Sequence, residues 1–242
     1  NTKHIAKKLE QAFKRDALIV HSVKISKESN ARGVDADFDM LGIGFPIYFR
    51  EAPELVSELL KSLDSQKKPI FFFTTKGMYS GNALRNLMEV AKERNFQNIG
   101  FIEFFMPGTD FLILFAKKNS LMEHSLKIDH FVASITKNSS VKMPPKKWYT
   151  FLDDRIVKYF EDKYDNHHRA YIGQFYSDPE TCTQCMRCVN GCPQHNIVLN
   201  GQIRFGLDCD VCFNCVHNCP TESIQIGEIT QENARYKKVE LY

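Results

Sequence analysis

The chain has little of what would mark it as a membrane, nucleic-acid-binding or secreted protein. Its longest strongly apolar run, Phe111–Ala116, is far too short to span a bilayer. The net charge of +3 is too weak to favour nucleic acid as a partner. No cysteine occurs before Cys182, which excludes the spread disulfide framework of small secreted domains. The opening residues show no signal-peptide pattern, so we expect a cytoplasmic protein.

All eight cysteines lie close together, in a motif that occurs twice. The two copies are Cys182-x2-Cys185-x2-Cys188-x3-Cys192-Pro193 and Cys209-x2-Cys212-x2-Cys215-x3-Cys219-Pro220. A zinc ribbon needs two C-x2-C pairs and has no use for the third cysteine of each run. The spacing is typical of two [4Fe-4S] clusters, each of which takes its fourth thiolate from the other copy.

The motif therefore predicts two crossed sets of ligands. One cluster is expected on Cys182, Cys185, Cys188 and Cys219, and the other on Cys209, Cys212, Cys215 and Cys192. The five residues after each run also align, as PQHNI and PTESI. Residues 168–228 resemble a bacterial-type ferredoxin with two pseudo-symmetric halves. Exposed clusters and thiolates fit a reducing cytosol, most simply that of an anaerobe.

The first two-thirds of the chain alternates amphipathic helices with short apolar strands, which predicts a parallel sheet covered on both faces. Ser80 is the expected N-cap of the third helix. We expect helices at 2–15, 53–63, 80–94 and 121–135, and strands at 18–25, 40–44, 70–75 and 98–105. Residues 139–147 have the composition of a linker, and an amphipathic helix is expected at 149–164. The predicted domains are 1–137, a linker with its helix at 138–167, and 168–242.

The expected order begins with a helix, although a doubly wound sheet normally opens on a strand that feeds a phosphate-binding turn. We therefore expect a first strand before Asn1. The predicted fold class is an α/β parallel sheet without that strand, followed by a small α+β domain that holds the cysteines.

Three segments at helix and strand ends suit a flat ligand that carries a phosphate. Thr2 stands at a helix N-terminus, where free N–H groups and its hydroxyl can bind phosphate, although a plain capped helix fits equally. Tyr48 follows Pro46 at a strand end, where its ring can stack on a flat ring or lie on the surface. Gly77 and Gly81 would let the backbone approach a ligand closely.

These segments resemble the flavodoxin–ferredoxin fusion family, in which a flavodoxin-like domain precedes a ferredoxin domain. Asn1-Thr2 followed by Ile5-Ala6 is similar to the end of the flavodoxin phosphate loop, and FPIY (45–48) is similar to the second flavin loop. TTKGMYSGNA (74–83) is similar to the third loop. NARY (233–236) is similar to a closing Arg-Tyr segment found after the clusters. The resemblance implies bound FMN, with contacts from Asn1, Thr2, Pro46, Ile47, Tyr48, Thr74, Thr75, Lys76, Gly77, Tyr79 and Gly81. A solvated Lys76 is the simpler reading of that residue.

A chain that held both FMN and [4Fe-4S] clusters would connect one-electron carriers with two-electron chemistry. We expect an electron-transfer protein, because no acid–base or nucleophile pattern accompanies the flavin loops. An FMN-dependent oxidoreductase, with Tyr48, Lys76 and Tyr79 nearest its substrate, is the alternative. A ferredoxin fused to a flavin-free docking domain is a third. The expected partner is a redox protein that gives or takes electrons. We expect no nucleic-acid partner and no membrane span. A homodimer is possible.

Overall fold

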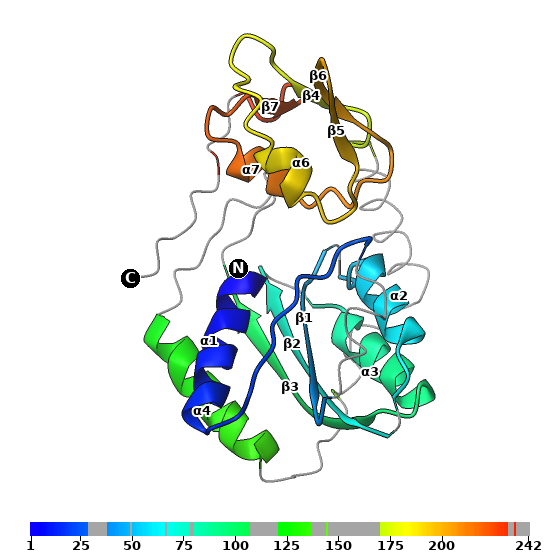
Figure 1. Ribbon diagram of the computed structural model, residues 1–242, viewed down its shortest axis with the longest axis vertical. Coiled ribbons are helices and arrows are strands. Elements are labelled where there is room, and N and C mark those ends of the chain that lie inside the picture. Colours follow the sequence, from blue (N-terminus) through cyan, green and yellow to red (C-terminus); the bar gives the residue numbers. More distant parts are fainter. Residues whose placement is uncertain are drawn as a thin grey trace, which may run out of the picture. The chain divides into compact units, whose positions relative to one another are not determined.

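The computed structural model describes residues 1–28, 38–48, 50–65, 67–77, 80–106, 121–136, 144, 170–231 and 235. These residues form two compact units, one up to residue 144 and one from residue 170 onward (Figure 1). The exact domain boundaries expected from the sequence stay predictions. The apolar run at 111–116, the linker expected at 139–147 and the helix expected at 149–164 fall outside the described residues, apart from residue 144.

The first unit is built on a parallel sheet of three strands in the order β1-β2-β3. The strands are β1 (Leu41–Pro46), β2 (Pro69–Lys76) and β3 (Gln97–Phe105). The central strand β2 has the sequence PIFFFTTK and is buried along almost its whole length. Such a continuous apolar run is what a strand needs when helices cover both of its faces.

Two pairs of helices cover the two faces of this sheet (Figure 1). The helices are α1 (Thr2–Arg15), α2 (Glu54–Ser62), α3 (Ala83–Glu93) and α4 (Leu121–Thr136). Phe72 belongs to the core under α2 and α3, whereas Phe71 and Phe73 belong to the core under α1 and α4. Alternate residues of β2 thus serve opposite faces, as the strand period of two requires. The centre of the Phe71 ring lies 5.5 Å from the centre of the Phe13 ring of α1 and 5.7 Å from that of the Phe131 ring of α4.

The prediction of a strand at residues 18–25 is wrong. These residues make no strand pairing, and Ile19 is 89% exposed. A strand is stabilised by hydrogen bonds to a neighbour, and β1 pairs only with β2 among the described residues. An apolar pattern alone therefore does not make residues 18–25 a strand.

Two smaller expectations also need correction. Strand β1 continues through Phe45 and Pro46, because an edge strand tolerates a residue without an N–H group. Helix α3 begins at Ala83 with Asn82 as its N-cap, so Ser80 does not cap it. The Ser80 hydroxyl instead lies 3.3 Å from the ammonium of Lys76. The other predicted helices and strands of this unit are confirmed to within one residue where the structure describes them.

As far as the structure describes it, the second unit consists of two short antiparallel strand pairs and two short helices (Figure 1). Its elements are β4 (Phe175–Ser177), α6 (Arg187–Gly191), β5 (Ile197–Asn200), β6 (Gln202–Phe205), α7 (Asn214–Asn218) and β7 (Ile224–Ile226). Strand β4 pairs with β7 and β5 pairs with β6, so the first and last strands close the unit. Among the described residues of the whole chain, no helix is long and apolar enough to cross a bilayer.

Candidate functional site

The backbone of the two cysteine runs repeats residue by residue. Gln184 and Val211, each two residues after the first cysteine of its run, have φ values of 51° and 46°. Met186 and Phe213, each directly after the second cysteine, have φ values of 61° and 56° and precede α6 and α7. Non-glycine residues enter this left-handed region at a cost of about 1 kcal/mol. Both runs therefore use the same costly pair of turns between their cysteines.

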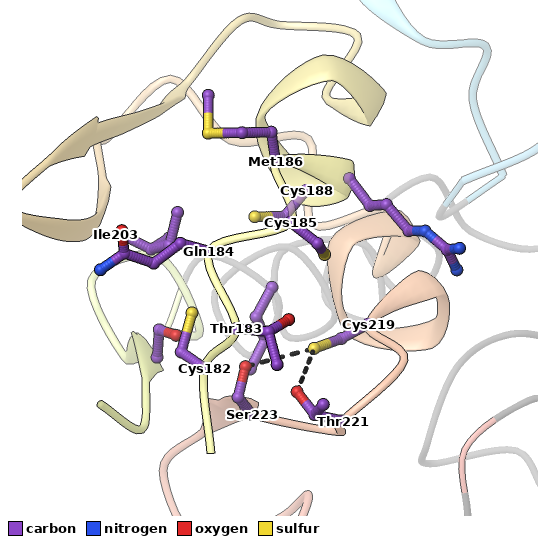
Figure 2. A pocket seen from close by; sticks show the side chains of 13 residues that line it. Cys182, Thr183, Gln184, Cys185, Met186, Cys188, Ile203, Cys219, Thr221 and Ser223 are labelled. Carbon is purple, nitrogen blue, oxygen red and sulfur yellow. Dashed lines mark hydrogen bonds between the residues drawn. The ribbon is translucent and has the colours of Figure 1, made fainter. Parts of the chain in front are cut away.

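A pocket in the second unit is lined by cysteines from both runs, which we call the Cys219 site (Figure 2). Cys182, Cys185 and Cys188 come from the first run and Cys219 from the second, and all four line the same pocket. Among the described residues, no three His, Cys, Asp or Glu side chains lie close enough to hold one metal ion. The four sulfurs surround a space, which fits a cluster better than a single zinc ion with sulfurs about 2.3 Å away.

The other four cysteines also lie together, in what we call the Cys192 site. Cys209, Cys212 and Cys215 of the second run each interact electrostatically with Cys192 of the first. Cys182 and Cys188 interact in the same way with Cys219. The fourth cysteine of each run is thus placed with the first three of the other run. This is the arrangement that the crossed ligand sets require, and the ligand assignment itself stays a prediction.

Burial affects the three thiols that the second run supplies to the Cys192 site. Burial raises the pKa of the Cys212 thiol to about 12 and raises the pKa of Cys215 well above its ordinary value. Burial also raises the pKa of Cys209. Because only a thiolate binds iron, these cysteines must lose protons when a cluster is inserted.

The Cys219 site has more polar surroundings. The nearby Ser177 hydroxyl is the main cause of the lowered pKa of Cys182. Burial alone would raise the pKa of Cys219, but hydrogen bonds, first with the hydroxyls of Ser223 and Thr221, bring it below its ordinary value. The Ser223 oxygen lies 3.2 Å and the Thr221 oxygen 3.7 Å from the Cys219 sulfur (Figure 2). Hydrogen bonds to sulfur and solvent exposure are among the features that set a cluster's reduction potential.

In the first unit, the three segments expected to bind flavin meet at the carboxyl ends of β1 and β2. The hydroxyl oxygens of Thr2 and Thr75 lie 2.7 Å apart. The Ile47 N–H donates to the Thr75 carbonyl at 3.0 Å. Thr74 is fully buried and donates its hydroxyl to the Phe45 carbonyl at 2.9 Å. The start of α1, the loop after β1 and the end of β2 are thereby joined at one edge of the sheet.

The loop after β1 folds into a tight turn that the third segment contacts. Tyr48 and Glu51 exchange backbone hydrogen bonds of 3.0 and 2.8 Å, and Arg50 between them has a φ of 72°. Gly81 has a φ of 52°, and a Cβ atom built on it would lie 2.5 Å from the Arg50 carbonyl oxygen. Only glycine fits there, so the second and third segments are held against each other.

Lys76 is not a solvated lysine. Its side chain is only 8% exposed, and its ammonium lies 2.9 Å from the carboxylate of Glu103 on β3. The same ammonium lies 4.7 Å from the centre of the Phe105 ring. Sequence reasoning missed Glu103, whose signal is a lone carboxylate in the otherwise apolar strand FIEFF. The buried ammonium of Lys76 needs a compensating charge, and the carboxylate on the neighbouring strand supplies it.

The remaining residues expected to contact FMN are placed as follows. Asn1 is the exposed N-cap of α1, and Pro46 ends β1. Gly77 is exposed just after β2, and Tyr79 lies outside the described residues. The whole set of FMN contacts stays a prediction.

Comparison with known families bears on the cysteine-rich unit. Residues 174–220 match the 4Fe-4S dicluster domain family. The match includes all eight cysteines, and it supports iron–sulfur clusters and electron transport as the class of function. No curated protein matches the chain significantly.

Two solved structures are similar to the chain. The two-electron reduced flavodoxin of Megasphaera elsdenii is 23% identical over 46% of this chain and 82% of its own, with a TM-score of 0.40. Rubredoxin oxygen:oxidoreductase from the anaerobe Desulfovibrio gigas is 17% identical over 56% of this chain and 32% of its own, with a TM-score of 0.44. Both scores are below 0.5, so these likenesses say nothing about function.

The predicted fold class is confirmed. The first unit is a parallel α/β sheet with helices on both faces, and the second is a small ferredoxin-type unit with an internal repeat. Together with the dicluster match, this order of units is consistent with a flavodoxin–ferredoxin fusion.

Proposed function

We propose that the chain is an electron-transfer protein that binds FMN in its first unit and two [4Fe-4S] clusters in its second. It would pass electrons between one-electron and two-electron redox partners in a reducing cytoplasm. When bound, each cluster supplies one-electron chemistry and the flavin one- or two-electron chemistry. The observation that carries the proposal is the crossed placement of the eight cysteines within a dicluster-type unit.

Each part of the second unit has a role in this proposal. The eight thiolates would hold the clusters, and the paired turns at Gln184 and Val211 would shape the two runs around them. The Asn196 N–H lies 3.4 Å from the Cys192 sulfur, and the Val211 N–H lies 3.4 Å from the Cys209 sulfur. Such N–H groups stabilise negative charge on sulfur.

The first unit would hold FMN at the edge where its three segments meet. The N-terminus of α1, with Thr2 bonded to Thr75, would take the phosphate. Tyr48, held by its turn, would stack on the flavin ring. Gly77 and Gly81 would bring backbone N–H groups close to the ring edge.

An electron carrier is favoured over an FMN-dependent oxidoreductase by the surroundings of Lys76. Its ammonium is already paired with the Glu103 carboxylate, so it is poorly placed to contact a substrate. At the Cys219 site, by contrast, Cys185 is exposed together with Thr183, Gln184 and Arg187. We propose that a redox protein, as donor or acceptor, approaches the second unit at this exposed side.

The proposal is tested by measuring flavin and iron in full-length protein purified without oxygen. One FMN and about eight iron atoms per chain are expected, the number that two cubanes require. About eight iron atoms without flavin, even after soaking with FMN, would overturn the flavin half. Steady turnover of a small molecule by the loaded protein, with dithionite as donor, would favour the oxidoreductase instead.

Replacing Tyr48 with alanine should weaken FMN binding about tenfold, because a lost aromatic stack is worth about 1 kcal/mol or more. Iron content should not change, since the cysteines lie in the other unit. Tyr48→Phe is the matched control, because it keeps the ring and should keep the affinity. Quenching of FMN fluorescence during titration of flavin-stripped protein measures the dissociation constant. If Tyr48→Ala and the wild type bind FMN with equal affinity, Tyr48 does not stack on the flavin.

A further inference from the structure

One buried cation lies beside the sulfurs of the second unit. Arg235 is 8% exposed and is the only arginine buried among the described residues. A buried guanidinium is costly unless its hydrogen bonds and charge are compensated. Its surroundings therefore indicate what it compensates.

The hydrogen bonds of Arg235 go to the loop that follows Cys219. Its Nη2 donates to the Ile224 carbonyl at 2.8 Å, to the Gln225 side-chain oxygen at 2.9 Å and to the Glu222 carbonyl at 3.3 Å. Its Nε lies 4.0 Å from the Glu222 carboxylate. That carboxylate belongs to a side chain that is 60% exposed, so water screens it.

This loop also carries the hydroxyls that contact the Cys219 sulfur, from Thr221 and Ser223. Arg235 thus fixes the segment that donates hydrogen bonds to a predicted cluster ligand. Its charge also reaches the sulfurs. Burial lowers the pKa of Arg235, and negative charges on Glu222, Cys219 and Cys215 oppose that change. An arginine guanidinium stays ionised in proteins.

The internal repeat shows that the Cys192 site is surrounded differently. In the second run, Asp210 stands where the first run has the neutral Thr183. The Asp210 carboxylate is half-buried, accepts a hydrogen bond from Gln194 at 2.9 Å, and interacts with Cys209 and Cys212. The cation therefore acts more strongly on Cys219 than on Cys215 of the Cys192 site, and the Cys192 site also has a carboxylate beside it.

We propose that Arg235 raises the reduction potential of the cluster at the Cys219 site, and that this site is the first of the two to be reduced. The inference rests on the proposed function, because it requires both clusters. Reduction adds one electron from an external donor and breaks no bond. The cluster and its thiolates become one unit more negative. A nearby buried positive charge favours that more negative form, and a nearby carboxylate disfavours it.

The test is an anaerobic redox titration of the full-length, iron-replete protein, with dithionite as reductant and electron paramagnetic resonance as readout. Arg235→Gln removes the charge and keeps an amide that can donate to the loop. At a fixed potential, we expect its ratio of oxidised to reduced cluster at the Cys219 site to rise about tenfold, or about 59 mV for one electron. Cys192→Ala, which should retain only this cluster, identifies its signal.

Two matched variants separate the charge from the fold. Arg204→Gln removes an exposed arginine of the same unit and should change the ratio less than twofold. Arg235→Lys keeps the charge and should lie between the wild type and Arg235→Gln. An iron-replete Arg235→Gln protein with the potential of Arg204→Gln would overturn the inference.

A further variant keeps the test decisive if Arg235→Gln loses iron. Glu222→Gln removes the carboxylate that opposes Arg235, so the Cys219 site should become easier to reduce, by about twofold in the same ratio. No change, or a change in the other direction, would overturn the inference. A wild-type protein without two cluster signals would instead refute the proposed function, which makes the two failures distinguishable.

Discussion

Replacing Cys192 with alanine should empty the cluster site formed by the second cysteine run and leave the first run loaded. Cys192 lies with Cys209, Cys212 and Cys215, although its sequence neighbours are the cysteines of the first run. Iron content should fall from about eight to about four atoms per chain, because a cubane with three thiolate ligands is readily lost. Iron analysis of anaerobically purified protein measures the loss.

The identity of the lost cluster is read from the cysteines that become reactive. Because burial raises the pKa of these thiols, a small alkylating reagent is applied to the native Cys192→Ala protein at alkaline pH for a long time. Mass spectrometry should then find the label on Cys209, Cys212 and Cys215. Cys219→Ala is the matched control and should give the reverse result, with label on the first run. Label on Cys182, Cys185 and Cys188 in Cys192→Ala would show that the ligand sets are not crossed.

The sequence predicts the cysteine unit well because its constraints are local. Ligand spacing, the proline after each run and the repeat all lie within short segments. The left-handed residues Met186 and Phe213 could not be predicted, since neither methionine nor phenylalanine favours that conformation. They adopt it where the cysteines on both sides must face one pocket. The sequence shows Arg235 only as part of the NARY segment (233–236). Its burial cannot be predicted, because it depends on a loop that precedes it in the chain.

In the first unit, prediction succeeds where an element is stabilised by its own pattern and fails where a distant partner decides. Helix α1 and strand β2 follow directly from the spacing of their apolar residues. Residues 18–25 have an apolar pattern but no paired neighbour, so they form no strand. The expectations for Ser80 and Lys76 are wrong for the same reason. The roles of these two residues depend on a contact with each other and on Glu103 of another strand.

Breaking the ion pair between Lys76 and Glu103 should have a large effect on the stability of the first unit. Glu103→Gln should destabilise the first unit by about 3 kcal/mol, because it leaves the ammonium of Lys76 buried without a carboxylate. Lys76→Met should cost less, about 1 kcal/mol, because Glu103 is 23% exposed and water can reach its carboxylate. Hydrogen exchange of the β2 amides in the full-length protein measures both values without unfolding the other unit.

The double variant Lys76→Met/Glu103→Gln should be more stable than Glu103→Gln alone, because no buried charge remains without a partner. A double variant as unstable as the sum of the two single variants would show that the pair is not coupled. FMN affinity adds an independent criterion. If Lys76 acts toward the flavin as a cation, Lys76→Met should weaken binding and Glu103→Gln should strengthen it, since removal of the carboxylate frees the charge. If Lys76 serves only Glu103, both single variants should change affinity in the same direction, through the shared distortion of β2 beside Thr75.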